Sequence, residues 1–167
     1  MNPTTHTISI LFTTYTDFAS KIVSAFSGFG YTHVSIALDT NDEYFYAFNT
    51  KGFKKEYPRK HKNRTKENIC YRLEITKKQY QKLSKLIKEF EKKKRQLSYN
   101  WAGLIFCLAT IPKKSRNKYF CSEFIATLLE KSKIVKLKRN TSRYLPNQLK
   151  KELALSPLIK SFKKNIF

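Results

Sequence analysis

Glycine and cysteine are scarce in this chain, and each scarcity argues against a class of protein. With four glycines in 167 residues, the chain has no glycine-rich loop of the kind that cradles phosphate groups, so we expect no nucleotide cofactor. The three cysteines, Cys70, Cys107 and Cys121, are an odd number without paired short spacing. They favour neither a disulfide framework nor a zinc site, and reduced thiols in a cytosol are the simplest interpretation. We therefore expect neither a cofactor nor a metal.

Long hydrophobic runs are also missing. The longest, Trp101 to Ile111, has about half of the roughly 20 residues that a membrane span requires. The N-terminal residues 1–7 lack a basic segment followed by an apolar core, so no signal peptide is visible. We expect a cytoplasmic protein with a single domain over 1–167, long enough to bury a core without disulfides or metal.

Acidic residues are few, and the chain is strongly basic. There are 34 Lys and Arg against 12 Asp and Glu, which gives a formal net charge of +22. Such a charge attracts nucleic acid, anionic lipid or an acidic polymer. A lysine-rich genome also produces charge of this kind, so the charge alone identifies no partner, and no required protein partner is inferred.

The apolar pattern predicts an α+β fold. A capping box formed by Thr76 and Gln79 opens the most clearly periodic helix. The helix that begins at Trp101 is expected to be buried, and the basic stretch Lys51 to Asn68 is expected to be a loop. Strands are predicted at 7–14, 32–39, 43–50 and 69–75, and helices at 18–26, 77–94, 101–110, 121–131 and 147–155.

Cys121 is a candidate nucleophile because it opens the predicted helix 121–131. A thiol at a helix N-terminus lies at the positive end of the helix dipole, beside unpaired backbone N–H groups that stabilise the thiolate. The alternative is that Cys121 is a small buried hydrophobic residue, as free cysteines often are. That alternative is the one we expect for Cys70 and Cys107, which lie among apolar neighbours.

A thiolate nucleophile needs a base, and His33 is the best candidate. His33 lies in a stretch that alternates like a half-buried strand, Tyr-Thr-His-Val-Ser-Ile-Ala-Leu-Asp. It shares one face with the small residues Ser35 and Ala37, while Val34 and Ile36 share the other. The imidazole therefore has room for a substrate, although a hydrogen-bonded structural histidine is the alternative.

A Cys-His site usually has a third polar group that holds the imidazole in the correct tautomer. If a three-residue loop, Thr40 to Asp42, joins the His33 strand to the next, Asn49 falls directly across from His33. With a two-residue loop, Tyr46 becomes the nearest polar neighbour instead. Glu56 and Asp39 are further candidates, and the sequence leaves the choice open.

These segments resemble the permuted papain-like amidases of the YiiX, YebB and YycO type, which are relatives of the NlpC cell-wall peptidases. The resemblance covers most of the chain, from Thr7 to about Leu149, and rests on the His33 strand, Tyr99-Asn100-Trp101-Ala102-Gly103-Leu104 and Tyr119-Phe120-Cys121-Ser122-Glu123-Phe124. In the unpermuted family the His strands follow the nucleophile helix, whereas here they precede it. The resemblance implies a circularly permuted papain-like fold, with an antiparallel sheet packed against helices.

The resemblance also implies roles for individual residues. Cys121 would be the nucleophile, His33 the general base, and Tyr99 a residue beside the oxyanion site whose hydroxyl assists charge stabilisation. The backbone N–H of Cys121 would be a second oxyanion donor. The third member of the triad does not carry over cleanly, which leaves Asn49 or Tyr46.

Two classes of function follow from these observations. The first is a cysteine-dependent hydrolase or acyltransferase that acts on an amide or ester bond of a peptide, cell-wall fragment or lipid through a thioester acyl-enzyme. The second is a non-catalytic basic module that binds nucleic acid or an anionic membrane on the same scaffold. Selective alkylation of one cysteine would favour the first, and a steep loss of binding with added salt would favour the second.

Overall fold

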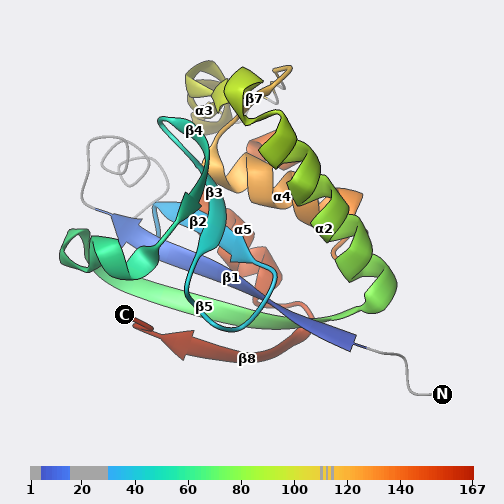
Figure 1. The fold of residues 1–167 in the computed structure, drawn as a ribbon. Coiled ribbons are helices and arrows are strands. Elements are labelled where there is room, and N and C mark those ends of the chain that lie inside the picture. The colour runs from blue at the N-terminus through green and yellow to red at the C-terminus, as the bar shows by residue number, and fades with distance from the viewer. Residues whose placement is uncertain (1–4, 16–29, 110, 112, 114) are drawn as a thin grey trace.

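One antiparallel sheet of six strands organises the chain (Figure 1). The computed structural model describes residues 5–15, 30–109, 111, 113 and 115–167. The strands lie in the order β4-β3-β2-β1-β5-β8, and a separate parallel pair, β6 and β7, joins two loops. Their bounds are β1 Thr5–Tyr15, β2 His33–Ala37, β3 Phe45–Asn49, β4 Gly52–Glu56, β5 Thr65–Thr76, β6 Ser98–Tyr99, β7 Lys118–Tyr119 and β8 Ile159–Lys164.

Within the described residues, four α-helices accompany the sheet, and the predicted α+β class is confirmed. They are α2 Lys77–Lys92, α3 Trp101–Leu108, α4 Cys121–Lys131 and α5 Pro146–Leu153, with three short 3₁₀ segments, η1 Pro58–Arg64, η2 Lys94–Gln96 and η3 Thr141–Arg143. The helix predicted at 18–26 lies outside the described residues. Of the helices in the described ranges, none combines the length and the apolar character that crossing a bilayer demands.

The predicted capping box at the start of α2 is confirmed. The Thr76 hydroxyl accepts a hydrogen bond from the backbone N–H of Gln79, at 3.3 Å, and the Gln79 side chain accepts one from the backbone N–H of Thr76, at 2.9 Å. Two N–H groups that the helix leaves without a partner are thereby satisfied.

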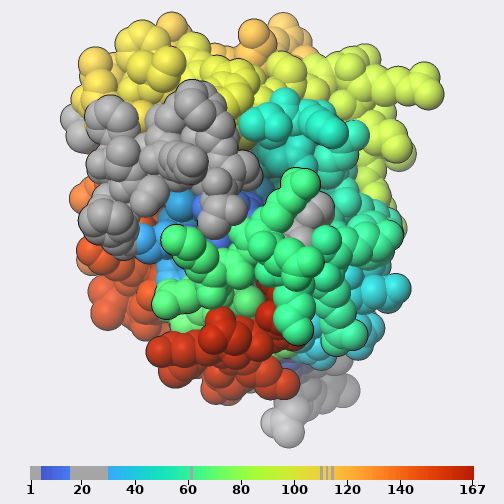
Figure 2. Space-filling view, turned by 90° about the vertical axis from the view of Figure 1, so that its left-hand side faces the viewer, coloured from blue at the N-terminus to red at the C-terminus, as the bar shows by residue number. Residues whose placement is uncertain are grey.

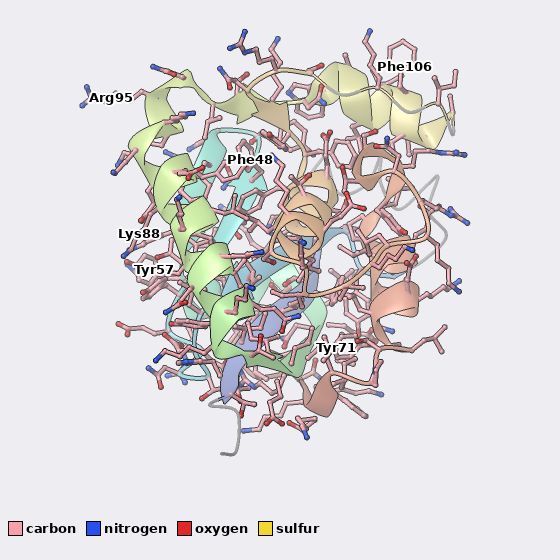
Figure 3. All side chains as sticks on the ribbon, turned by 90° about the vertical axis from the view of Figure 1, so that its right-hand side faces the viewer. Phe48, Tyr57, Tyr71, Lys88, Arg95 and Phe106 are labelled. Carbon is pink, nitrogen blue, oxygen red and sulfur yellow. The ribbon has the colours of Figure 1, made fainter. Side chains whose placement is uncertain are left out.

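The main core lies between the sheet and the helices α2 and α4. Aromatic rings from four elements meet there: the Phe124 ring centre lies 5.1 Å from that of Phe48, 5.0 Å from that of Phe90 and 5.7 Å from that of Phe53. In Figure 3, Phe48 lies between α2 and α4. This packing holds α4, and with it Cys121, against strands β2 and β3.

The opposite face of the sheet carries a smaller cluster. Leu11, Cys70 and Phe45 form it, and Ile166 and Phe167 from the C-terminal segment pack over them. The same face holds a buried Arg72, whose guanidinium donates to Ser9 and pairs with Asp42. Asp42 has a φ of 59°, a turn conformation that Asp tolerates better than most residues. The ion pair therefore ties the β2–β3 turn to β5.

The prediction of a loop over 51–68 is wrong. This stretch forms β4, η1 and the first residues of β5. Gly52, with a φ of 90°, lies in the turn from β3, and Phe53 is buried against Phe48. Lys54 is exposed on this edge strand. Because lysines dominate the stretch, its single buried aromatic gives too little alternation for a strand to be recognised.

Two further expectations need correction. The helix expected at 101–110 is present as α3, Trp101–Leu108, but it is not buried on all sides, since Ile105 is 63% exposed. The strand β8 was not anticipated, because almost all of its residues are exposed and it binds β5 through the backbone. The helices predicted at 77–94, 121–131 and 147–155 are present as α2, α4 and α5.

Candidate active site

Cys121 is the first residue of α4, as the sequence predicts. The preceding Phe120 is in an extended conformation, with φ −102° and ψ 167°, and no side-chain hydrogen bond caps the helix. Phenylalanine has no acceptor atom to offer the first-turn N–H groups, so the start of the helix keeps donors for an incoming oxygen. Cys121 itself is 5% exposed and contacts the main core.

His33 is the first residue of β2 and pairs with Thr13 of β1. Its side chain is buried, and the Tyr15 ring lies against it with a centre-to-centre distance of 5.3 Å. The Cys121 side chain lies close enough to the imidazole to raise the pKa of His33. The structure thus brings together the two residues that the sequence singled out as nucleophile and base.

The other side of the imidazole is held by Glu56. Oε2 of Glu56 lies 2.8 Å from Nε2 of His33, and both side chains are about nine-tenths buried. Since Nε2 is engaged by Glu56, Nδ1 is the ring nitrogen left for the sulfur. Asn49 binds the other oxygen of this carboxylate: its Nδ2 donates to Oε1 of Glu56 at 2.9 Å.

The environment of His33 favours its protonated form. Burial alone would lower its pKa, but the negative charge and hydrogen bond of Glu56, together with the nearby Cys121 side chain, outweigh burial. The pKa of His33 is therefore raised well above its usual value. An imidazolium held in this way stabilises a neighbouring thiolate.

The third polar residue differs from the two that the sequence favoured. Ile36 pairs with Tyr46, which is the register of the three-residue loop and sets Asn49 level with His33. Tyr46 lies with Ile36 in the main core, away from His33. The carboxylate on Nε2 comes from Glu56, and the predicted Asn49 binds that carboxylate. Asp39 instead accepts from the backbone N–H of Asn41, at 2.9 Å, within the turn.

One signal in the sequence marks Glu56. It is the single acidic residue between Lys51 and Lys66. An isolated carboxylate in a basic stretch is well suited to a specific partner, but the prediction of a loop there left Glu56 among the weaker candidates. The missed strand β4 and the low rank of Glu56 therefore have the same cause.

Tyr99 lies close to the start of α4. It pairs with Tyr119 in the parallel β6–β7 contact, two residues before Cys121, and packs against the cluster that contains Phe120. Its ring also lies against Trp101, with centres 4.9 Å apart. The structure thus places Tyr99 beside the nucleophile helix.

The residue after Tyr99 links α3 to α4. Asn100 is fully buried, accepts from the backbone N–H of Gly103 at 2.9 Å, and donates to Glu123 at 3.2 Å. A Cβ on Gly103 would lie 2.0 Å from the Asn100 amide nitrogen, so only glycine fits there. This contact fixes the two helix N-termini relative to each other.

The two other thiols are in different surroundings. Burial raises the pKa of Cys70 to about 12, and burial together with Glu123 raises the pKa of Cys107 to about 12. Both side chains are therefore thiols at neutral pH. No group of three His, Cys, Asp or Glu side chains in the described ranges is arranged to hold a metal ion.

Figure 2 shows the side of the molecule towards which the arrowhead of β1 points in Figure 1. Blue atoms of the β1–β2 region lie recessed there behind the turquoise and green atoms of β4 and η1. Tyr15 is the last residue of β1, and His33 is the first residue of β2.

A scan of the sequence against protein-family models finds no match, and no curated protein matches it either. The site is defined by its own contacts: Cys121 begins α4, the His33 imidazole lies near it, and the Glu56 carboxylate is bound to Nε2 of His33.

Proposed function

We propose that the protein is a cysteine-dependent hydrolase or acyltransferase that acts on an amide or ester bond, with Cys121 as nucleophile and His33 as general base and acid. The observation that carries this proposal is the contact of His33 with Cys121 on one side and Glu56 on the other. We also propose that the fold is the circularly permuted papain-like arrangement that the resemblance implies, since an antiparallel sheet precedes a helix that begins with the cysteine.

The reaction starts with the Cys121 thiolate and the His33 imidazolium. The sulfur attacks the carbonyl carbon of the substrate, and a carbon–sulfur bond forms while the carbonyl oxygen becomes negative. His33 then gives its proton to the leaving amine or alcohol as the carbon–nitrogen or carbon–oxygen bond breaks. The product of this first half-reaction is a thioester between the acyl group and Cys121.

In the second half, His33 takes a proton from water or from another acceptor. The resulting nucleophile attacks the thioester carbonyl, and the sulfur leaves as a thiolate. Water gives hydrolysis, and an alcohol or amine acceptor gives acyl transfer. The proposal leaves peptides, cell-wall fragments and lipids as the candidate substrates.

The surrounding groups have separate tasks in this scheme. Glu56 orients the imidazole and stabilises its protonated form, and Asn49 positions the Glu56 carboxylate. The backbone N–H of Cys121 stabilises the oxyanion, since helix-terminal donors point at this position. We propose the Tyr99 hydroxyl as a second oxyanion donor because of its place beside the start of α4.

Competitive alkylation tests the proposal within one chain. We expect iodoacetamide near neutral pH to modify Cys121 far faster than Cys70 or Cys107, because the pKa of each of the latter two thiols is raised to about 12 by burial. Mass spectrometry of the digested protein gives the three rates. The substitution His33→Ala is expected to slow the Cys121 rate at least tenfold.

A generic ester provides the matching test of acyl transfer. With p-nitrophenyl acetate we expect an acetyl thioester on Cys121 that hydroxylamine removes, and no such adduct in Cys121→Ser. Equal alkylation of all three cysteines, or a Cys121 rate that His33→Ala leaves unchanged, would contradict the proposal and favour a non-catalytic binding module.

A further inference from the structure

The outer face of α3 is apolar and exposed. Trp101 is 41% exposed, Ile105 is 63% exposed, and Ile111, just beyond the helix, is 51% exposed. The inner face of the same helix is closed, because Leu104 and Cys107 are buried in a cluster with Phe120 and Leu145. A helix with an apolar inner face needs no apolar outer face for folding, so the outer one points to a contact outside the chain.

Cations surround this helix, and acids are missing from its part of the sequence. Residues 92–122 contain no Asp or Glu. The Lys113 ammonium lies 4.2 Å from the centre of the Phe106 ring on α3. Arg139 and Arg143 approach from the η3 side, near enough to affect the pKa of Cys107. The Lys and Arg residues of the stretch are Lys92, Lys93, Lys94, Arg95, Lys113, Lys114, Arg116 and Lys118.

The face lies at one end of the molecule. In Figure 1, α3 is at the end opposite β8. Figure 3 shows Phe106 at the outer edge of that end, with Arg95 at its other corner, and in Figure 2 the yellow atoms of α3 form the same end. Of the described elements, α3 is therefore among those that a flat partner at this end of the molecule would meet first.

We propose that the outer face of α3 docks on the surface of an anionic lipid bilayer. Tryptophan and isoleucine side chains enter the boundary between headgroups and acyl chains, and the surrounding Lys and Arg side chains bind the lipid phosphates. The exposed Trp101 and Ile105 are four residues apart and therefore lie along one side of α3, so in this proposal the helix lies in the plane of the surface.

Charge decides between this partner and two others. A second copy of the chain would bring the same cations face to face, which opposes association. A nucleic acid offers phosphates but no apolar layer for Ile105 and Ile111. An anionic bilayer satisfies both the apolar face and its cationic border.

This docking goes beyond the proposed chemistry and does not depend on it. The Asn100 contact with Glu123 joins the start of α3 to the first turn of α4. A bilayer bound to α3 is therefore held at a fixed position relative to Cys121.

The chain supplies its own reporter for the test. Trp101 is its single tryptophan, and it lies on the proposed face. With the full chain and vesicles of phosphatidylcholine mixed with phosphatidylglycerol, we expect a blue shift of tryptophan emission and co-sedimentation. Vesicles of phosphatidylcholine alone are expected to bind at least tenfold more weakly, and added salt is expected to weaken binding to the anionic vesicles.

Two pairs of variants separate the apolar and charged parts of the face. Ile105→Ser with Ile111→Ser keeps the reporter and is expected to weaken binding at least tenfold. Leu155→Ser with Phe162→Ser is the matched control, since these residues are 78% and 58% exposed on another part of the surface. Lys113→Glu with Arg116→Glu is expected to weaken binding more than tenfold, and Lys78→Glu with Lys85→Glu, on α2, much less.

Three results would overturn the docking. They are no emission shift with anionic vesicles, wild-type binding by the Ile105→Ser, Ile111→Ser variant, or a dimer in solution that this variant dissolves while vesicles stay unbound. Cys121→Ser is expected to bind vesicles as tightly as the unmodified chain. Failure of the proposed cysteine chemistry therefore leaves the docking result standing, and the reverse also holds.

Discussion

The imidazole of His33 has a sulfur on one side and a carboxylate on the other. Each of these neighbours favours the imidazolium, and together they outweigh the cost of burying a charge. The protonated form of His33 therefore depends largely on Glu56.

A prediction at this scale concerns the pH dependence of Cys121 alkylation. Because Glu56 raises the pKa of His33, the substitution Glu56→Gln is expected to lower that pKa. The imidazolium then loses its proton at a lower pH. We expect the alkaline limb of the rate profile to move to lower pH by about one to three units, the usual effect of a nearby opposite charge. Rates with iodoacetate, whose negative charge favours reaction while the imidazolium is protonated, test this when they are measured from acid to alkaline pH.

Asn49→Ala serves as the control for that experiment. It removes the hydrogen bond to Oε1 but leaves the charge of Glu56 in place, so the limb is expected to move much less than in Glu56→Gln. An alkaline limb that stays fixed in Glu56→Gln would contradict an electrostatic role for this carboxylate.

Among the site residues, the sequence identified Cys121 and His33 through local patterns. The sequence alone shows both features: a thiol at the start of an amphipathic stretch, and an imidazole on the polar side of a predicted strand. Glu56 was ranked low because its position relative to His33 depends on the antiparallel pairing of β4 with β3. A local sequence pattern does not predict that pairing. The register of the β2–β3 hairpin was likewise open until the loop length was known.

At the scale of elements, α4 positions Cys121, and the aromatic contacts of α4 keep the helix in place. Phe124 is fully buried and lies against Phe48, Phe53 and Phe90. These rings come from β3, β4 and α2. The helix is thus joined to the strand that carries Glu56.

We predict that Phe124→Ala lowers the free energy of unfolding by about 3–5 kcal/mol, since it removes a buried ring that the core cannot replace. Urea denaturation followed by circular dichroism measures this. Phe162→Ala, at a ring that is 58% exposed, is expected to cost under about 1 kcal/mol. If Phe124→Ala lowers the free energy of unfolding by less than about 1 kcal/mol, the ring cluster does not anchor α4.

The elements that were predicted correctly are those whose own residues specify them. The capping box and apolar spacing define α2, and the β-branched run defines β1. In contrast, β8 is formed by backbone pairing to β5, with side chains that remain exposed. The exposed side of α3 could not be foreseen either, because its apolar composition is that of a buried helix.

At the scale of the whole molecule, the C-terminal segment closes the second face of the sheet. Asn68 of β5 makes three hydrogen bonds with it. Its backbone C=O accepts from the N–H of Asn165 and its side-chain oxygen accepts from the N–H of Ile166, each at 2.9 Å, and its backbone N–H donates to Oδ1 of Asn165 at 3.2 Å. Ile166 and Phe167 then cover the cluster that contains Cys70.

We predict that Ile166→Ser with Phe167→Ser raises the alkylation rate of Cys70 several-fold. Burial is what raises the pKa of Cys70 to about 12, so loss of the cover lowers that pKa and gives the reagent access. The rate of Cys107 in the same chain is the internal control and should not change. If Cys70 reacts no faster, the C-terminal residues do not form its cover.

The order of the segments has a consequence for biosynthesis. The strands that carry His33 and Glu56 precede the helix that begins with Cys121 by many residues. A ribosome therefore releases the imidazole and its carboxylate before the sulfur has been added to the nascent chain. Until translation has reached α4, the growing polypeptide therefore lacks the thiol to which we assign the chemistry.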